Sequence, residues 1–381
     1  MKYGDFVRRM PAGTAELSRR RGVLSRLHLD WVLLAILLAL TSFGLIVLYS
    51  ASSRSMGTLY RQSTFFLIAY GVMFVIAQLD MERVKRWAPL GYAAGLVLLM
   101  VLPWVGVTAK GATRWLNIGG FQFQPSEIMK LAAPMAVAWY LSSRVLPPRF
   151  KHIAIALLII GVPALVVAEQ PDLGTAILIA AAGAFVLFLA GLSWRYIVGA
   201  VAAIAAAAYP LWEYVLHDYQ RTRILTLLDP EADKLGAGWN IIQSKTAIGS
   251  GGFWGKGWLL GTQSHLDFLP EGHTDFIIAV LSEEWGLRGV LILLTLYLAL
   301  IARGMWIAIN AKHCFARLVA GSVVLTFVVY VFVNMGMVGG LLPVVGVPLP
   351  LISQGGTALV VLFAGFGLLM AIASEKRILV Q

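Results

Sequence analysis

The sequence predicts an all-α integral membrane protein with about ten transmembrane helices and one large extracytoplasmic loop between the seventh and eighth. Of the 381 residues, 59% are hydrophobic and only 13% are charged, whereas about 25% of the residues of a soluble domain are charged. Apolar segments recur along the chain at lengths near the roughly 20 residues that a helix needs to cross a bilayer. Lysine and arginine gather in alternate connecting segments, which is typical of cytoplasmic loops.

The apolar segments are the candidate spans. The segment 128–143 carries one charge, Lys130. The last apolar run, within 318–374, is divided into two spans by "LLPVVGVPLPLISQGG" (341–356), because its three prolines cannot continue a helix. We expect that segment to be an outer loop. The other candidate spans are 31–53, 62–79, 87–109, 152–168, 173–194, 196–216 and 274–302.

The distribution of basic residues predicts the orientation. Most of them lie in the polar arm 1–30, in the short loops on the same side and in the tail 375–381, so we expect both termini in the cytoplasm. The membrane domain would then span 31–374, with the large loop 217–273 in the periplasm. The same bias accounts for the net charge of +11, so no nucleic acid is expected as a partner. The single cysteine, Cys314, excludes an internal disulfide.

The large outer loop is too apolar and aromatic for a disordered linker. Its stretch "RTRILTLLD" (221–229) has helical spacing and suits an amphipathic segment on the membrane face. The stretch "NIIQSKTAIGSGG" (240–252) predicts a second short helix that ends at glycine. We interpret the glycine cluster 249–257 as a plain turn and not as a phosphate cradle, because no Walker pattern is present.

Several outer residues are candidates for contact with an anionic ligand. Lys110, Arg114, Arg221 and Arg223 could hold a phosphate, and each is equally well explained as an exposed surface cation. Trp115 suits an interfacial anchor, and also a stacking platform for a sugar or a lipid head group.

Four charged residues lie inside predicted helices, where charge is costly and usually faces a cavity. Glu127 and Lys130 are three residues apart and share a helix face, and Glu283 and Glu284 are adjacent in the eighth span. One interpretation is a structural ion-pair network, in which Lys130 pairs with Glu127 or with one of the other glutamates across helices. The other is that all four line or brace one polar cavity.

The segment His273-Thr274-Asp275 lies where polar sequence gives way to the apolar eighth span. Asp275 has no cation at helical spacing on its own helix. Its position alone favours a helix cap or a first-turn acid.

A long stretch of the chain resembles the signature of the SEDS family, and within it the RodA branch. This stretch is "GAGWNIIQSKTAIGSGGFWGKGWLLGTQSHLDFLPEGHTDFIIAVLSEEWG". The stretches "KGATRWLNIGGFQFQPSEIMK", "EQPDLGTAIL" and "PVVGVPLPLISQGGTAL" agree with the family as well and occur in its order. The resemblance covers nearly everything after residue 28. The chain departs from the family pattern at Gln354, where an aromatic residue is usual.

The resemblance implies a peptidoglycan glycosyltransferase that polymerises lipid II at the outer face of the inner membrane during cell elongation. It implies a class B penicillin-binding protein transpeptidase and other elongation-complex membrane proteins as partners. The aspartate of the family's "HTD" motif is its candidate catalytic residue, here Asp275, and the tryptophan of its "RW" motif, here Trp115, is functionally important. The resemblance implies no particular cofactor and is compatible with a divalent cation.

The chemistry of this reaction needs one base. Lipid II holds its sugar by an α-linked diphosphate and the polymer is β-1,4-linked, so the anomeric carbon is inverted in one displacement. Asp275 would remove the proton from the attacking hydroxyl, and cations or a metal would neutralise the diphosphate. A lipid flippase or transporter and a non-enzymatic scaffold are the alternatives. The candidate substrate-binding residues are Trp115, Lys130, Glu127, Arg114, Arg221, Arg223, His273, Glu283 and Glu284.

Overall fold

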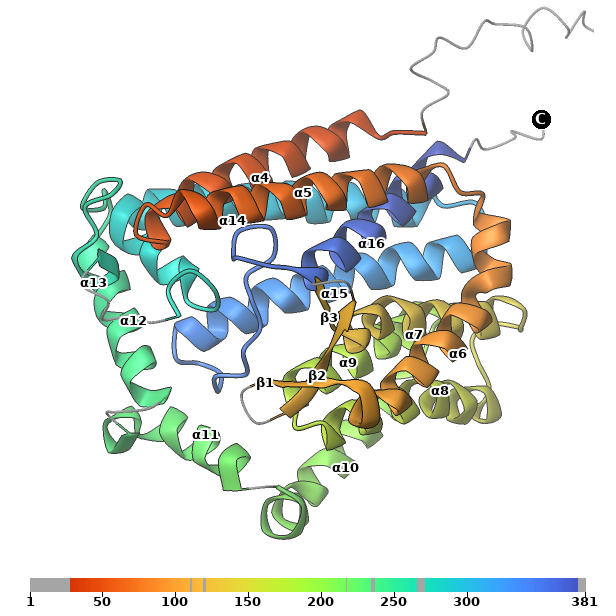
Figure 1. Ribbon diagram of the computed structural model, residues 1–381. Helices are drawn as coiled ribbons and strands as arrows, with labels where there is room; N and C mark the ends of the chain where they lie inside the picture. Colours follow the sequence, from red (N-terminus) through yellow and green to blue (C-terminus); the bar gives the residue numbers. More distant parts are fainter. Residues whose placement is uncertain are drawn as a thin grey trace, which may run out of the picture.

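The protein is a bundle of long apolar helices, which confirms the prediction of an all-α multi-pass membrane protein (Figure 1). The computed structural model describes residues 28–109, 112–118, 121–216, 218–233, 237–265 and 271–375. Most of the predicted N-terminal arm and of the C-terminal tail lies outside these residues. Eight of the described helices are long and apolar enough to cross a membrane: α4 (Trp31–Ala51), α5 (Met56–Ala77), α6 (Met81–Val105), α8 (Phe150–Glu169), α10 (Trp194–Pro210, continued by a π-helical turn), α14 (Ile277–Asn310), α15 (Cys314–Val338) and α16 (Thr357–Ser374).

The two remaining predicted spans are also helices. They are α7 (Pro125–Ser142), which carries Glu127 and Lys130, and α9 (Leu173–Leu189), which has 17 residues. Both pack inside the bundle, against each other and against α8 and α15. Every predicted span therefore coincides with a helix.

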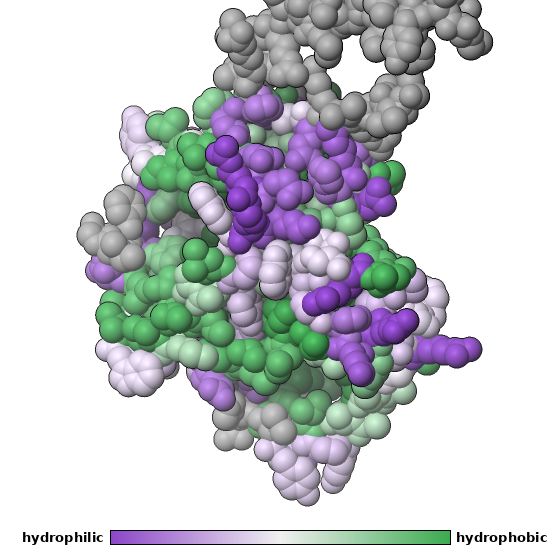
Figure 2. Space-filling model, turned by 90° about the vertical axis from the view of Figure 1, so that its right-hand side faces the viewer, coloured by the Kyte–Doolittle hydropathy of each residue, from purple (hydrophilic) through white to green (hydrophobic). Residues whose placement is uncertain are grey.

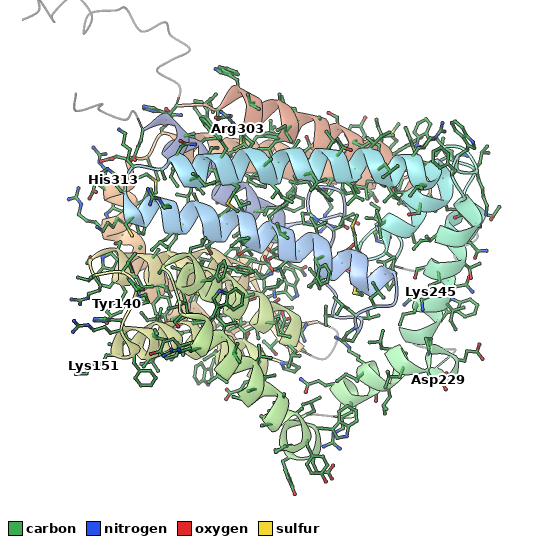
Figure 3. All side chains as sticks on the ribbon, turned by 180° about the vertical axis from the view of Figure 1, so that it is seen from behind. Tyr140, Lys151, Asp229, Lys245, Arg303 and His313 are labelled. Carbon is green, nitrogen blue, oxygen red and sulfur yellow. The ribbon has the colours of Figure 1, made fainter. Side chains whose placement is uncertain are left out.

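The basic loops and the long outer loop lie at opposite ends of the bundle. Figure 3 shows Lys151 and His313 at one end and Lys245 and Asp229 at the other. Hydrophilic residues also cover much of the end face seen in Figure 2. This separation is the one that the charge bias predicts.

The predicted outer loop 108–126 contains a small antiparallel sheet, which the sequence pattern does not predict. Its strands are β1 (Val107–Ala109), β2 (Ala112–Ile118) and β3 (Phe121–Phe123), in the order β1-β2-β3. Threonine, tryptophan, isoleucine and phenylalanine favour strands, but so short a sheet needs support from neighbouring elements. Here β2 packs on α6 and α7.

The large outer loop contains the two predicted helices. They are α11 (Asp218–Leu228) and α12 (Ala237–Gly251), separated by a 3₁₀ turn, η2 (Pro230–Asp233), and followed by α13 (Thr262–His265). Gly252 follows the end of α12 with a φ of 56°, in the left-handed conformation typical of a helix C-terminus.

The segment 341–356 is irregular, as its prolines predict. Leu341 and Gly346 are exposed, but the later part, 347–353, is largely buried in the bundle. Leu349, Leu351 and Ile352 are each 1% exposed. Irregular backbone at this depth is stable only where its polar groups find partners within the protein. Tyr297 on α14 donates to Pro350 O at 2.6 Å, and Gln62 on α5 accepts from Gly355 N at 3.1 Å.

The eighth span is broken near its outer end. Gly286 has φ 66° and ψ −161°, which are not helical values, and it divides α14 into a short outer piece and a long inner piece. The short piece begins directly after Asp275, and Glu283 and Glu284 lie at its far end.

Candidate active site

Asp275 lies outside α14, which argues against its interpretation as a helix cap. The N-cap of the helix is Phe276, the cap has no side-chain hydrogen bond, and the first turn contains no acidic residue. The side chain of Asp275 is half-buried. Its Oδ2 lies 3.6 Å from where a Cβ on Gly346 would stand, so the carboxylate lies against the exposed part of the segment 341–356.

The backbone on either side of this carboxylate is held by the same segment and by α15. Gln354 N donates to His273 O at 3.0 Å, and Asn334 Nδ2 donates to Asp275 O at 2.8 Å. Asn334 is not among the predicted site residues, although an asparagine in an otherwise apolar span indicates a functional role.

Glu127 and Lys130 form an ion pair within α7, which settles the partner of Lys130. Their Oε1 and Nζ atoms are 2.7 Å apart, and the two residues are 5% and 8% exposed. The Lys130 ammonium also lies 5.2 Å from the centre of the Tyr330 ring on α15. These three residues and Thr326 line a small cavity of about 40 Å³.

A second, smaller cavity adjoins the first. It has a volume of about 30 Å³, shares Tyr330, Ala358 and Leu362 with the first, and is lined by much of the segment 348–355. Ser353, one of its lining residues, donates to Thr274 O, next to Asp275.

A third cavity is an apolar groove of about 320 Å³ between α5, α6, α7 and α16. Leu131 and Val361 line both this groove and the cavity of the ion pair. The remaining lining is almost wholly aliphatic, with Trp87 at the α6 side. An apolar chain in the groove would thus lie next to Glu127 and Lys130.

Glu283 and Glu284 do not share this cavity, which corrects the expectation that all four charges line one space. Glu283 is fully buried, and its Oε1 accepts from Lys256 Nζ at 2.7 Å, Thr262 Oγ1 at 3.0 Å and Gln263 N at 2.9 Å. Glu284 accepts a hydrogen bond from Ser50 on α4. Both glutamates fasten α14 to its neighbours.

Glu283 and Glu284 lie away from that cavity because the glycine cluster 249–257 wraps around the break in α14. Lys256 N and Gly257 N donate to Glu283 O and Glu284 O at 3.0 and 2.9 Å, and Leu287 N donates to Gly252 O at 2.9 Å. The cluster is thus a turn, as expected, and it brings Lys256 to Glu283.

The outer cations lie in different places. Arg114 Nε on β2 donates to Gln170 O at 3.0 Å and its Nη2 to Pro171 O, so this guanidinium joins β2 to the turn before α9. Arg221 Nη2 donates to Glu213 O at 2.8 Å. Arg221 and Arg223 belong to α11, which packs on η2 and α12 at one corner of the molecule (Figures 1 and 3). Lys110 lies outside the described residues.

Two further candidates lie on the outer side of the bundle. Trp115 is half-buried in β2, where it pairs with Val107 of β1. The His273 side chain is also half-buried, two residues before Asp275. Within the part of the chain that the structure describes, no group of three or more His, Cys, Asp or Glu side chains is arranged to hold a metal ion.

The fold and this arrangement of charges define a multi-pass membrane protein with a buried ion pair and a half-buried carboxylate beside an irregular segment. The chain matches the family model described as cell cycle protein, for FtsW, RodA and SpoVE, over residues 30–378. It is 54% identical over 354 residues to the peptidoglycan glycosyltransferase MrdB of Escherichia coli K12, which covers 93% of this chain and 96% of that protein.

Two solved structures are similar over 92% of this chain and 98% of their own. One is a chain of a peptidoglycan synthase complex, solved to explain how polymerization and crosslinking are coordinated, with a TM-score of 0.81 and 32% identity. The other is the rod shape determining protein RodA of Thermus thermophilus, with a TM-score of 0.70 and 29% identity.

The chain belongs to the FtsW/RodA/SpoVE family, the SEDS family that its motifs resemble. The predicted enzyme class, peptidoglycan glycosyltransferase, is confirmed through the close relative that carries this name, and the RodA branch through the similar structures.

Proposed function

We propose that this protein polymerises lipid II into β-1,4-linked glycan strands at the outer face of the inner membrane during cell elongation, with Asp275 as the general base. The observation that carries the proposal is the half-buried Asp275 carboxylate beside Gly346. It directly follows Thr274, whose carbonyl accepts from Ser353, a residue that lines the cavity next to that of Glu127 and Lys130.

A base in this position suits a single inverting displacement. The attacking sugar hydroxyl must lose a proton, and an ionised carboxylate accepts it. Diphosphate is a good leaving group and needs no acid, but its developing charge needs compensation. His273, two residues before Asp275, and Trp115 in β2 are the candidates to contact the sugars of the substrate.

The apolar groove suits the polyprenyl tail of such a substrate. A chain of isoprene units has no polar group to satisfy, and a groove with an aliphatic lining between four helices would exclude water from it. The shared wall at Leu131 and Val361 puts the groove next to Lys130, so a head group could extend from the groove toward the polar cavities.

The same proposal includes the surroundings of the enzyme. Both termini lie in the cytoplasm and the large loop 217–273 lies in the periplasm, which agrees with the separation of basic loops and long loop at opposite ends of the bundle (Figure 3). The partner is a class B penicillin-binding protein. The similar chain from a peptidoglycan synthase complex that coordinates polymerization with crosslinking supports this partner.

The test is polymerisation of purified lipid II by the purified protein in detergent, with and without the penicillin-binding protein. We expect glycan strands to form, because polymerisation needs no sealed membrane. A flippase would show transport in vesicles and no polymer in detergent, and a scaffold would show neither. Absence of polymer from folded protein in the presence of the partner would contradict the proposal.

A further inference from the structure

We propose that Ser353 and Asn334 are positioning residues for Asp275, and that the irregular segment 341–356 and α15 together set the direction of its carboxylate. This inference rests on the proposed role of Asp275 as the general base. It concerns residues that lie behind the carboxylate and act on it through the backbone.

The observation is that three successive backbone carbonyls are captured one after another. His273 O accepts from Gln354 N at 3.0 Å, Thr274 O from Ser353 Oγ at 2.5 Å, and Asp275 O from Asn334 Nδ2 at 2.8 Å. These residues precede the first turn of α14, so the helix does not fix their peptide planes. A backbone amide and two side chains of other elements do so instead.

Asn334 joins three elements through one amide group. Its Nδ2 donates to Asp275 O and also to Val347 O at 2.7 Å. Because both partners are carbonyls, which only accept, the nitrogen must face them and the orientation of the amide is fixed. Val347 follows Gly346, against which Asp275 Oδ2 lies. One side chain on α15 therefore holds the backbone of Asp275 and the segment that its carboxylate touches.

The Oδ1 atom of the same amide lowers the stability of the fold. Asn334 is fully buried, and among the described residues nothing donates to its Oδ1. A buried acceptor without a donor is destabilising. An apolar side chain at this position on α15 would remove that acceptor, but it would also leave Asp275 O and Val347 O without this donor.

Ser353 is fixed in the same way. Its Oγ donates to Thr274 O and accepts from Leu349 N at 2.9 Å, and the residue is 3% exposed. The segment that carries it is anchored by Tyr297 through Pro350 O and by Gln62 through Gly355 N. Supports of this kind hold a reacting group to within a fraction of an ångström.

The experiment compares Ser353→Ala and Asn334→Ala with a matched control, Ser244→Ala. Ser244 on α12 is also a fully buried serine, and its Oγ donates to Val338 O of another helix at 3.0 Å.

For each variant, kcat and KM for lipid II polymerisation and the thermal unfolding midpoint are measured with the partner present. A misplaced base lowers the rate of the chemical step and leaves binding intact. We expect kcat to fall by about tenfold to a hundredfold for Ser353→Ala and Asn334→Ala, at unchanged KM. Ser244→Ala should lower the unfolding midpoint by a similar amount and keep the wild-type kcat.

A kcat for Ser353→Ala equal to that of Ser244→Ala would overturn the inference, and so would a raised KM at unchanged kcat. Because removal of Asn334 could prevent folding, Ser353→Ala decides the question by itself in that case. Loss of activity in Asp275→Asn together with full activity in Ser353→Ala removes the positioning role and leaves the proposed function standing. Full activity in Asp275→Asn removes the base assignment itself.

Discussion

Glu283 shows how a carboxylate inside a predicted span can serve the fold. It has no exposed surface and accepts hydrogen bonds from Lys256, Thr262 and Gln263. The residue pattern alone could not distinguish this role from a place in the substrate cavity. The difference lies in the turn 249–257, whose path around Gly286 is a tertiary feature that no local spacing encodes.

We expect Glu283→Gln to lower stability and to leave the chemical step intact. The substitution removes the charge opposite Lys256, and breaking a buried ion pair costs about 3–5 kcal/mol. The Lys256 side chain is 28% exposed, so we expect the lower end of that range. Thermal unfolding and kcat per folded molecule are measured. Glu284→Gln is the comparison, because it makes the same change at the neighbouring glutamate, which accepts from the Ser50 hydroxyl. A large fall in kcat at unchanged stability would contradict this assignment.

The ion pair of Glu127 and Lys130 allows stability and substrate capture to be separated. Lys130→Met alone leaves the buried Glu127 carboxylate without its cation, and we expect a loss of about 3–5 kcal/mol in the free energy of unfolding. The double variant Glu127→Gln/Lys130→Met removes both charges and should recover most of that stability. It should not recover a low KM for lipid II if the pair faces the head group. A wild-type KM in the folded double variant would make the pair purely structural.

At the scale of elements, the break in α14 is the feature that the sequence pattern does not predict. The apolar pattern of 274–302 predicts one continuous helix, and Gly286 looks like any other helical glycine in it. The backbone there has φ 66° and ψ −161°, which only glycine adopts without strain. The neighbouring turn 249–257 enforces that conformation. The small outer sheet escaped prediction for a similar reason, since its short strands depend on α6 and α7 for support.

We expect Gly286→Ala to destabilise the protein by about 3 kcal/mol, as the sum of backbone strain and overpacking. A Cβ at this position would lie 2.6 Å from Phe253 O, against the turn. The control is Gly161→Ala in the middle of α8, where a Cβ meets nothing within 4 Å. That control should be neutral or slightly stabilising, because alanine favours helix. Equal unfolding midpoints for the two variants would show that the break is not needed.

At the scale of the whole molecule, the spans and the separation of the basic loops from the long loop follow from elementary patterns. Length and apolarity determine where helices cross a bilayer, and these properties are local. The burial of 347–353, within the irregular segment 341–356, is not a local property. Its prolines predict irregular backbone, but its depth depends on Tyr297, Gln62 and Asn334 from three other helices.

The orientation is tested by labelling single cysteines in a Cys314→Ser background. Leu341 and Val145 are suitable positions, because they are 78% and 87% exposed. A membrane-impermeant maleimide added to spheroplasts should label Leu341→Cys. It should label Val145→Cys only after permeabilisation. Labelling of Val145→Cys in intact spheroplasts would reverse the proposed topology.

The most direct measurement of the central claim is the rate of lipid II polymerisation by Asp275→Asn. Asparagine keeps the size of the side chain and loses its basicity, and the backbone bonds of Asp275 O do not involve the side chain. Loss of a general base costs about two to four orders of magnitude in rate. We expect a fall of at least about a hundredfold, with membrane insertion, unfolding midpoint and copurification of the penicillin-binding protein unchanged. Polymerisation at a near wild-type rate would contradict the account, and the base would then have to be sought at Glu127.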